Sequence, residues 1–364
     1  MQDLSKYEQL LDNNMPADVL EELASYKGKD GNVVFIIAEA RRMLGHFEEA
    51  ITLYTKAIKL FSARKNIPSE ELSNYNAQKT DMLLALAKCY RTLGDAKTAY
   101  SVAAEAFALI EKDPSLLDFK MQAVQEMGMA LRAYGKLDEA EKLLLQVMAY
   151  YKAQKDAAGQ GFIHWALGGI CRLKGQFKQG IAHFNLSVQL ARRAGDKISL
   201  AYGYCGLAGI SRIAGDIKAC VDNYKKAEKI FNNTQDIFGK AYTNCGMANG
   251  LRQLGKYDEA LKRYVRADML YSSINDTVDL GFVKWGKADV LKRKNKLNEA
   301  LAELKEAKKL FASSDEIRGQ LLTEFALAQL IYALGDGAAA VKVYDAALAR
   351  AKKEQLFTYL ESYT

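Results

Sequence analysis

Small and large side chains recur along this chain in a pattern that repeats about every 40 residues, a period typical of repeat proteins. Each copy has a small residue before a short turn, then a large residue and a second small one after it, as in Ala208, Tyr224 and Ala227. Small residues let neighbouring helices approach closely, and large ones fill the gaps between them. The pattern therefore predicts a series of helix-turn-helix units. The small residues before the turns are Ala38, Ala87, Gly128, Gly168, Ala208, Ala248, Ala288 and Ala328.

A glycine marks the turn of nearly every copy. Most of these glycines keep the spacing that separates Gly135 from Gly175, or a multiple of it, and Asn295 replaces the one that is missing from the series. Glycine and asparagine are the residues that most readily adopt the left-handed conformation that ends a helix. We therefore expect a left-handed residue at each of these turns. They are Gly45, Gly94, Gly135, Gly175, Gly215, Gly255, Asn295 and Gly335.

The residues around these turns are also alike: Leu-Gly-Lys-Tyr-Asp-Glu-Ala ends at Ala260, and Lys-Asn-Lys-Leu-Asn-Glu-Ala ends at Ala300. This pattern resembles the tetratricopeptide repeat (TPR), a helix-turn-helix unit of solenoid proteins. The resemblance implies an all-α fold, a right-handed α-α superhelix of about eight repeats plus capping helices. The 40-residue period resembles the arrays of Pins-type adaptors and, more loosely, kinesin light chains. The repeats are expected at 31–61, 80–112, 121–154, 161–194, 201–234, 241–274, 281–314 and 321–351.

The ends and the junctions of the array depart from the repeat. Residues 1–30 are expected to form a degenerate helical cap, and residues 352–364 a C-terminal capping helix. An insertion at 62–80 is expected to extend the helix that follows it. Acidic residues recur between repeats, where aspartate is a good N-cap for the next helix. They are Asp156, Asp196, Asp236, Asp276 and Glu316.

Composition supports a helical protein. The chain has only 3 Pro among its 364 residues, and proline interrupts helices. No apolar run approaches the roughly 20 residues of a membrane span, and the first residues lack the basic and then apolar stretch of a secretory signal. The 5 Cys form no CxxC pair, which is typical of a reducing compartment. We therefore expect a cytoplasmic protein.

The sequence contains no recognisable catalytic or metal-binding motif. No second His or Cys stands at metal-ligand spacing from any of the 3 His, and there is neither a phosphate-binding P-loop nor a Gly-x-Ser-x-Gly elbow. Gly203, Gly206 and Gly209 recur at a spacing of three within an expected helix, which favours close helix packing over nucleotide binding. We expect no enzymatic activity and no cofactor.

One position of the repeat, three residues before the turn glycine, carries a cation in seven consecutive copies. A cation in the last turn of a helix stabilises the helix dipole or pairs with a nearby acid. Arginine at six of the seven positions also favours planar, bidentate recognition of a carboxylate or phosphate. Both interpretations stay open. We call these residues the cation ladder: Arg42, Arg91, Arg132, Arg172, Arg212, Arg252 and Lys292.

Two further positions place aromatic residues on the same predicted helix stripe, which would line the concave groove of a TPR array. The alternative is that these residues pack helix against helix. The carboxylate clamp of chaperone adaptors needs a lysine at the repeat position of Trp165 and Trp285, and no repeat carries one there. The candidate partner-binding residues are Arg132, Arg172, Arg212, Arg252, Lys292, Phe162, Trp165, Tyr202, Tyr242, Asn249, Phe282 and Trp285.

The sequence therefore predicts a non-enzymatic interaction scaffold that binds an acidic or amphipathic peptide in its groove. The alternative is a binder of polyanions such as single-stranded nucleic acid, which would use the arginines for phosphate and the aromatic rings for stacking. The formal net charge of only +7 is weak support for that alternative.

Overall fold

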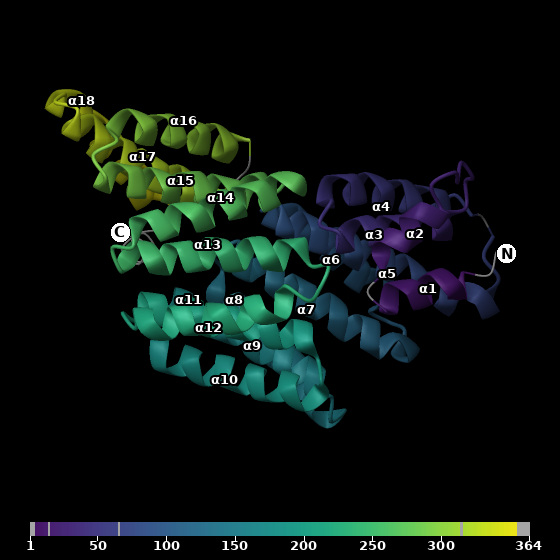
Figure 1. The fold of residues 1–364 in the computed structure, drawn as a ribbon. Helices are drawn as coiled ribbons and strands as arrows, with labels where there is room; N and C mark the ends of the chain where they lie inside the picture. Colours follow the sequence, from purple (N-terminus) through teal and green to yellow (C-terminus); the bar gives the residue numbers. More distant parts are fainter. Residues whose placement is uncertain (1–3, 14, 65, 314–315, 355–364) are drawn as a thin grey trace. The chain divides into compact units, whose positions relative to one another are not determined.

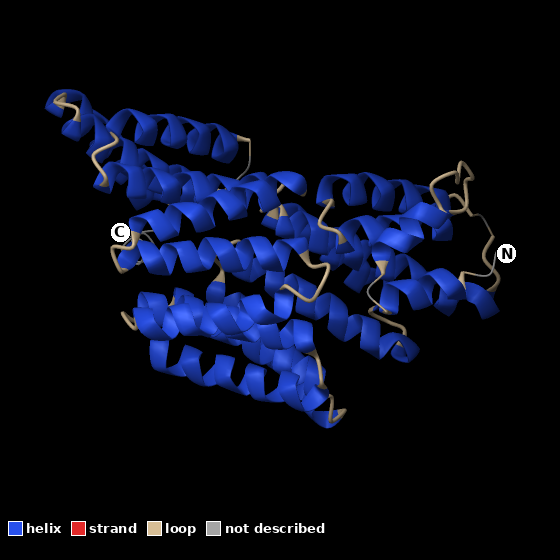
Figure 2. Ribbon diagram, viewed as in Figure 1, coloured by secondary structure: helices blue, strands red, loops and turns tan. Residues whose placement is uncertain are grey.

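The structure of the chain is a computed structural model that describes residues 4–13, 15–64, 66–313 and 316–354. Every regular element in these residues is a helix, eighteen of them α-helices, and Figure 2 shows no strand in the part described. The predicted all-α class is therefore confirmed. Residues 352–364, the expected C-terminal cap, lie almost entirely outside the described part.

The chain divides into two compact units, which are described separately. The first comprises Met1–Ile170 and Gln189–Ala194, and the second comprises Cys171–Val188 and Gly195–Thr364. The helices α9 and α10 each contribute residues to both units.

The first unit begins with two short helices in the region of the expected N-terminal cap, and hairpins of longer helices follow (Figure 1). Each of the pairs α3–α4, α5–α6 and α7–α8 packs together as a hairpin. The predicted extension of the helix after the insertion is confirmed, because α5 runs for 21 residues. The helices are α1 (Ser5–Asp12), α2 (Pro16–Glu22), α3 (Gly31–Met43), α4 (Phe47–Ser62), α5 (Leu72–Thr92), α6 (Ala96–Ile110), α7 (Leu117–Ala133), α8 (Leu137–Ala153) and α9 (Ala157–Leu173).

The second unit repeats the same hairpin with little variation (Figure 1). The first helices of successive hairpins also contact one another, α11 with α13, α13 with α15 and α15 with α17. These first helices begin about four residues before the expected repeat boundaries. The helices are α10 (Phe177–Ala194), α11 (Lys197–Ile213), α12 (Ile217–Phe231), α13 (Ile237–Gln253), α14 (Tyr257–Ser273), α15 (Thr277–Arg293), α16 (Leu297–Ala312), α17 (Ile317–Ala333) and α18 (Gly337–Lys353).

The turns within the hairpins have the predicted left-handed residues. All seven turn glycines have positive φ, from 73° to 98°, and Asn295 has a φ of 59°. Asparagine therefore fills the glycine position in the α15–α16 turn at a backbone conformation that most residues avoid.

The acidic residues between repeats cap the helices that follow them, with one exception. Asp196 accepts a hydrogen bond from the backbone N–H of Ser199 at 2.9 Å, and Asp156, Asp236 and Asp276 make the equivalent bond. Glu316 makes no such bond, and its carboxylate pairs with Arg318 instead. The longer side chain of glutamate thus forms an ion pair instead of capping the helix.

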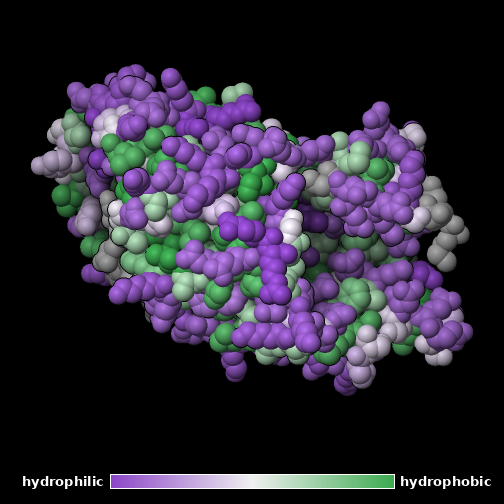
Figure 3. Space-filling model, turned by 60° about the horizontal axis from the view of Figure 1, so that its bottom comes forward, coloured by the Kyte–Doolittle hydropathy of each residue, from purple (hydrophilic) through white to green (hydrophobic). Residues whose placement is uncertain are grey.

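The core of each unit lies between the helices, where small residues face large ones. A Cβ atom added at Gly206, Gly246 or Gly286 would meet a ring of the preceding hairpin, from Phe184, Tyr224 and Tyr264 respectively. Gly206 thus serves close packing, as its spacing predicts. On the face drawn in Figure 3, polar side chains predominate, with apolar ones showing between them.

Candidate peptide-binding groove

In the second unit, the last two cations of the ladder reach from one hairpin to the next. Arg252, near the end of α13, places Nη1 3.0 Å from Asp289 Oδ2 on α15. Lys292, near the end of α15, places Nζ 2.7 Å from Gln329 Oε1 on α17. In both pairs the partner lies 37 residues further along the chain. These cations therefore link neighbouring first helices.

Two other arginines of the ladder lie over glycines at the same 37-residue separation. The Nη1 atom of Arg132 lies 2.5 Å from the position that a Cβ at Gly169 would occupy. Arg172 stands in the same relation to Gly209, at 2.7 Å. The missing side chain makes room for each guanidinium group.

The remaining arginines of the ladder either form ion pairs or are buried. Arg42 pairs with Glu39 on its own helix, and Arg91 pairs with the buried Glu126 on α7, with Nη2 3.2 Å from Oε2. Arg212 is only 8% exposed. Ion pairing, one of the two interpretations of the ladder, is thus observed at Arg42, Arg91, Arg252 and Lys292.

The candidate aromatic residues at the start of the helices pack against other aromatic rings. Tyr202 donates a hydrogen bond to Asp236 at 2.9 Å, and its ring meets Phe231 edge to face at 5.1 Å. Phe282 meets Phe311 in the same way at 4.9 Å. Tyr242 stacks on a neighbouring ring of α13. The contacts of Tyr202 and Phe282 correspond to the packing alternative, because each joins two helices, whereas that of Tyr242 lies within α13.

The two tryptophans occupy equivalent positions beneath arginines. The guanidinium carbon of Arg252 lies 4.8 Å from the ring centroid of Trp285, and that of Arg132 lies 5.2 Å from Trp165. Phe162 packs against Trp165 at 5.9 Å. Such cation–π contacts stabilise a guanidinium group that has lost part of its water.

Asn249 takes part in a polar contact inside its own hairpin. The hydroxyl of Tyr264 donates to Asn249 Oδ1 at 2.6 Å. In the first hairpin the hydroxyl of Tyr54 donates to Glu39 at the same sequence separation. This contact thus recurs with different acceptor residues.

The structure brings Arg252, Trp285 and Lys292 together in one pocket of about 610 Å³ in the second unit. We call it the groove pocket. Its volume falls within the usual range for ligand sites. The other candidate residues do not line it. Its lining is Arg252, Gln253, Leu254, Gly255, Tyr257, Trp285, Ala288, Asp289, Lys292, Arg293, Ala300, Leu304, Leu322, Phe325, Ala326, Gln329 and Leu330.

Three cations of the groove pocket surround a single carboxylate. Arg252 Nη1 and Arg293 Nε each lie 3.0 Å from Asp289 Oδ2, and Lys292 Nζ lies 3.3 Å from Oδ1. Burial raises the pKa of Asp289, but these cations outweigh burial and hold the pKa below its ordinary value. With three positive charges and one negative charge in its lining, the pocket carries a net charge of +2.

Sequence reasoning did not select three residues that shape this pocket. Asp289 and Gln329 are the partners of ladder cations, and Phe325 supplies an aromatic wall. The first two are found only through the 37-residue separation that the structure shows between a cation and its partner. Phe325 stands on the same stripe as the tryptophans, one repeat after Trp285.

The described residues include no group of three or more His, Cys, Asp or Glu side chains that could hold a metal ion. Within the same residues, no helix is both long and apolar enough to span a membrane.

No family model matches the chain, and no curated protein matches its sequence. Solved structures match it by fold. A Rap protein complexed with competence and sporulation factor has a TM-score of 0.68 at 15% identity, covering 84% of this chain and 83% of its own. Aspartyl phosphate phosphatase F from Bacillus subtilis has a TM-score of 0.57 at 15% identity, with coverages of 85% and 84%.

The Cut9–Hcn1 hetero-tetramer of the APC/C is also similar, with a TM-score of 0.52 and 16% identity. That match covers 86% of this chain and 60% of the other. These matches show that the chain shares with these proteins its fold, an all-α array of helical hairpins of the predicted TPR-like kind.

Proposed function

We propose that the chain is a non-enzymatic interaction scaffold whose groove pocket binds an acidic or amphipathic segment of a partner protein. The observation that carries the proposal is the excess of cations around Asp289, next to the apolar walls formed by Trp285 and Phe325. A peptide that carries a carboxylate beside a large apolar side chain would be complementary to both parts.

Two of the similar structures were solved as complexes: a Rap protein with competence and sporulation factor, and Cut9 with Hcn1. They support the idea that a fold of this type serves to bind partners. The acidic character of the ligand rests on the charges of this chain alone.

The alternative function, binding of a polyanion such as single-stranded nucleic acid, has less support from the structure of the cation ladder than from the sequence. Glu39, Glu126 and Asp289 already neutralise much of the charge of their arginine partners. A phosphate backbone would need several free cations in a row. Binding of single-stranded nucleic acid at low salt would nevertheless favour this alternative over the peptide.

The proposal is tested by selecting peptides from a display library on the full chain and measuring their affinity by fluorescence anisotropy. The Lys292→Gln/Arg293→Gln double variant removes two cations at the mouth of the pocket. We expect it to weaken binding of the selected acidic peptides by roughly tenfold or more, because each lost charge removes a favourable Coulomb interaction.

The control is Lys296→Gln, which removes an exposed cation of the next turn that does not line the pocket. It should change the affinity less than about twofold, since exposed charges contribute little. Trp165→Phe provides a direct readout, because it leaves Trp285 as the only tryptophan. Selection of no acidic peptide, or equal binding by the double variant, would refute the proposal.

A further inference from the structure

The helix before α3 is shorter than the helices at the corresponding place elsewhere. The helices α4, α12 and α16 have 15 to 16 residues, and each packs against the first helix of the following hairpin. The helix α2 packs against α3 but has only 7 residues. At 1.5 Å per residue it is about 10 Å long, whereas the 13-residue α3 is about 20 Å long. About half of the length of α3 therefore extends beyond the cover that α2 provides, and α1 is the other short helix that contacts α3.

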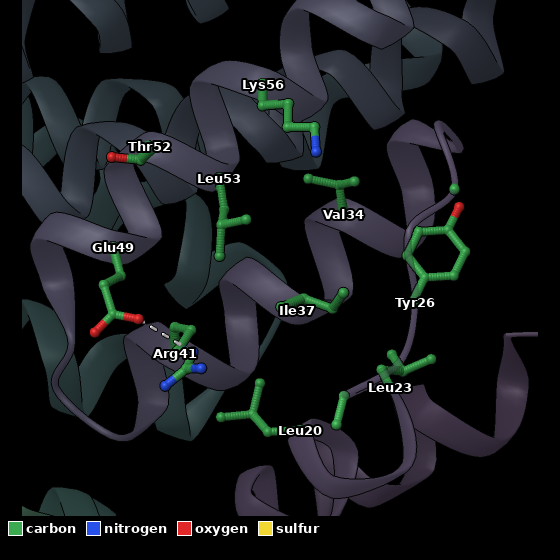
Figure 4. Close-up of a pocket in the computed structure, with 12 residues that line it drawn as sticks. Leu20, Leu23, Tyr26, Val34, Ile37, Arg41, Glu49, Thr52, Leu53 and Lys56 are labelled. Atoms are coloured by element: carbon green, nitrogen blue, oxygen red, sulfur yellow. Dashed lines mark ion pairs between the residues drawn. The ribbon is translucent and has the colours of Figure 1, made fainter.

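A pocket of about 420 Å³ opens where the cover ends, and we call it the N-terminal pocket (Figure 4). Val34 and Ile37 project into it from α3, and Leu53 projects from α4. Leu20 and Leu23 close it from the side of α2. Its floor is thus built from apolar side chains of three helices, all within the first unit.

Charged side chains border this apolar floor. Arg41 Nε pairs with Glu49 Oε2 at 3.4 Å, so these two charges compensate each other. Lys56 extends from α4 across the pocket toward Val34 (Figure 4), and no carboxylate of the described residues forms an ion pair with it. The lining therefore has one uncompensated positive charge next to an apolar floor.

We infer that the N-terminal pocket receives an amphipathic α-helix of a partner protein, with apolar side chains inserted into the pocket and an acidic side chain bonded to Lys56. The partner helix would continue the cover that α2 begins. A whole helix, about 10 Å or more across, would not fit inside 420 Å³, so it would lie over the pocket and insert one apolar face.

The charge of the rim argues for an acidic partner. An acidic side chain one helical turn from the inserted apolar residues would lie on the same face and reach Lys56. A basic helix would bring like charges together at Lys56. The site lies in the first unit and shares no residue with the groove pocket, so it does not depend on the proposed function.

The experiment uses a display library of helical peptides of about 18 residues, with apolar residues at i, i+3, i+4 and i+7 and variable residues elsewhere. Selection on the full chain should enrich acidic sequences. Lys56→Glu should weaken binding of the enriched peptides by about tenfold or more at low salt, because it replaces an attraction with a repulsion.

Lys59→Glu is the matched control, since it makes the same change of charge at an exposed position of α4 that does not line the pocket. It should alter the affinity less than about twofold. Both variants should keep the thermal midpoint of the wild type, which separates loss of binding from loss of folding.

Three results would overturn the inference. One is enrichment of no acidic helix. Another is binding that Lys56→Glu and Lys59→Glu affect equally. The third is self-association of the chain that Lys56→Glu abolishes in sedimentation experiments, because this result would assign the N-terminal pocket to a second copy.

Discussion

Arg252 and Asp289 form an ion pair between two neighbouring first helices, with Nη1 and Oδ2 3.0 Å apart. The side chain of Arg252 is 6% exposed and that of Asp289 is 15% exposed. The pair therefore links α13 and α15, and the net positive charge of the groove pocket comes from the other two cations of its lining, Lys292 and Arg293.

Replacing Asp289 with Asn should destabilise the protein by roughly 1–3 kcal/mol, because it leaves the buried charge of Arg252 without its partner. The free energy of unfolding in urea measures the effect. Glu299→Gln is the control, since it breaks the exposed pair with Lys296 and should cost less than about 1 kcal/mol. Equal losses in the two variants would mean that the Arg252–Asp289 pair is no more important than a surface pair.

The buried carboxylate of Asp276 should make stability depend on pH. Burial raises its pKa to about 6, and the nearby Asp279 also has a raised pKa because of burial and the charges of Asp276 and Glu316. The folded chain thus binds more protons than the unfolded chain between about pH 4 and pH 6. The free energy of unfolding therefore falls as the pH rises through this window.

Asp276→Asn removes the charge but keeps a good N-cap for α15. We expect it to stabilise the protein by roughly 1–3 kcal/mol at pH 7.5 and to have little effect at pH 4, where the folded wild type is already protonated. Urea denaturation at both pH values tests this. A gain of the same size at pH 4 would contradict the electrostatic explanation.

The turn at Asn295 offers a test of backbone conformation. Asn295 has a φ of 59°, which alanine adopts less readily than asparagine. Asn295→Ala should therefore lower the free energy of unfolding by about 1 kcal/mol, whereas Asn295→Gly should leave it unchanged or raise it slightly. Asn298→Ala, at an exposed position of α16, is the control and should be neutral or mildly stabilising. Thermal unfolding distinguishes these cases, and a harmless Asn295→Ala would show that the left-handed conformation carries no penalty there.

Two glycines of α11 should respond differently to alanine. At Gly206 a new methyl group would meet the ring of Phe184, which is packed in the core, so we expect a loss of roughly 1–3 kcal/mol. At Gly209 it would meet the end of the Arg172 side chain, which can move aside. Helix propensity then favours alanine by about 1 kcal/mol, so the Gly209→Ala protein should be little changed or more stable. Comparing the urea midpoints of Gly206→Ala and Gly209→Ala tests this difference.

Much of the fold could be predicted because it depends on residues close together in sequence. The left-handed Asn295 and the capping Asp196 both act within one turn of a helix, so spacing alone located them. The partners of the ladder cations could not be predicted in this way. The contact of Arg252 with Asp289 depends on how far one hairpin is displaced from the next, which the pattern within a repeat does not contain.

The packing between hairpins also decides which aromatic residues line a pocket, and the repeat pattern could not separate these from the others. Tyr202 and Trp285 stand on one predicted helix stripe, and the sequence assigned both to the groove surface. In the structure Tyr202 packs against Phe231 at a helix end, while Trp285 lines the groove pocket. Residues on one predicted stripe can therefore have different surroundings, because the neighbouring helices pack differently around each of them.

The 37-residue step between a ladder cation and its partner has a consequence for how such chains can change in length. Because Arg212 and Arg252 hold the same position in successive repeats, excision of residues 213–252 would join Arg212 to Gln253 and bring Arg212 into the place of Arg252, with Asp289 still in reach. Unequal recombination that removes this one unit would therefore shorten the gene without depriving Asp289 of its arginine partner.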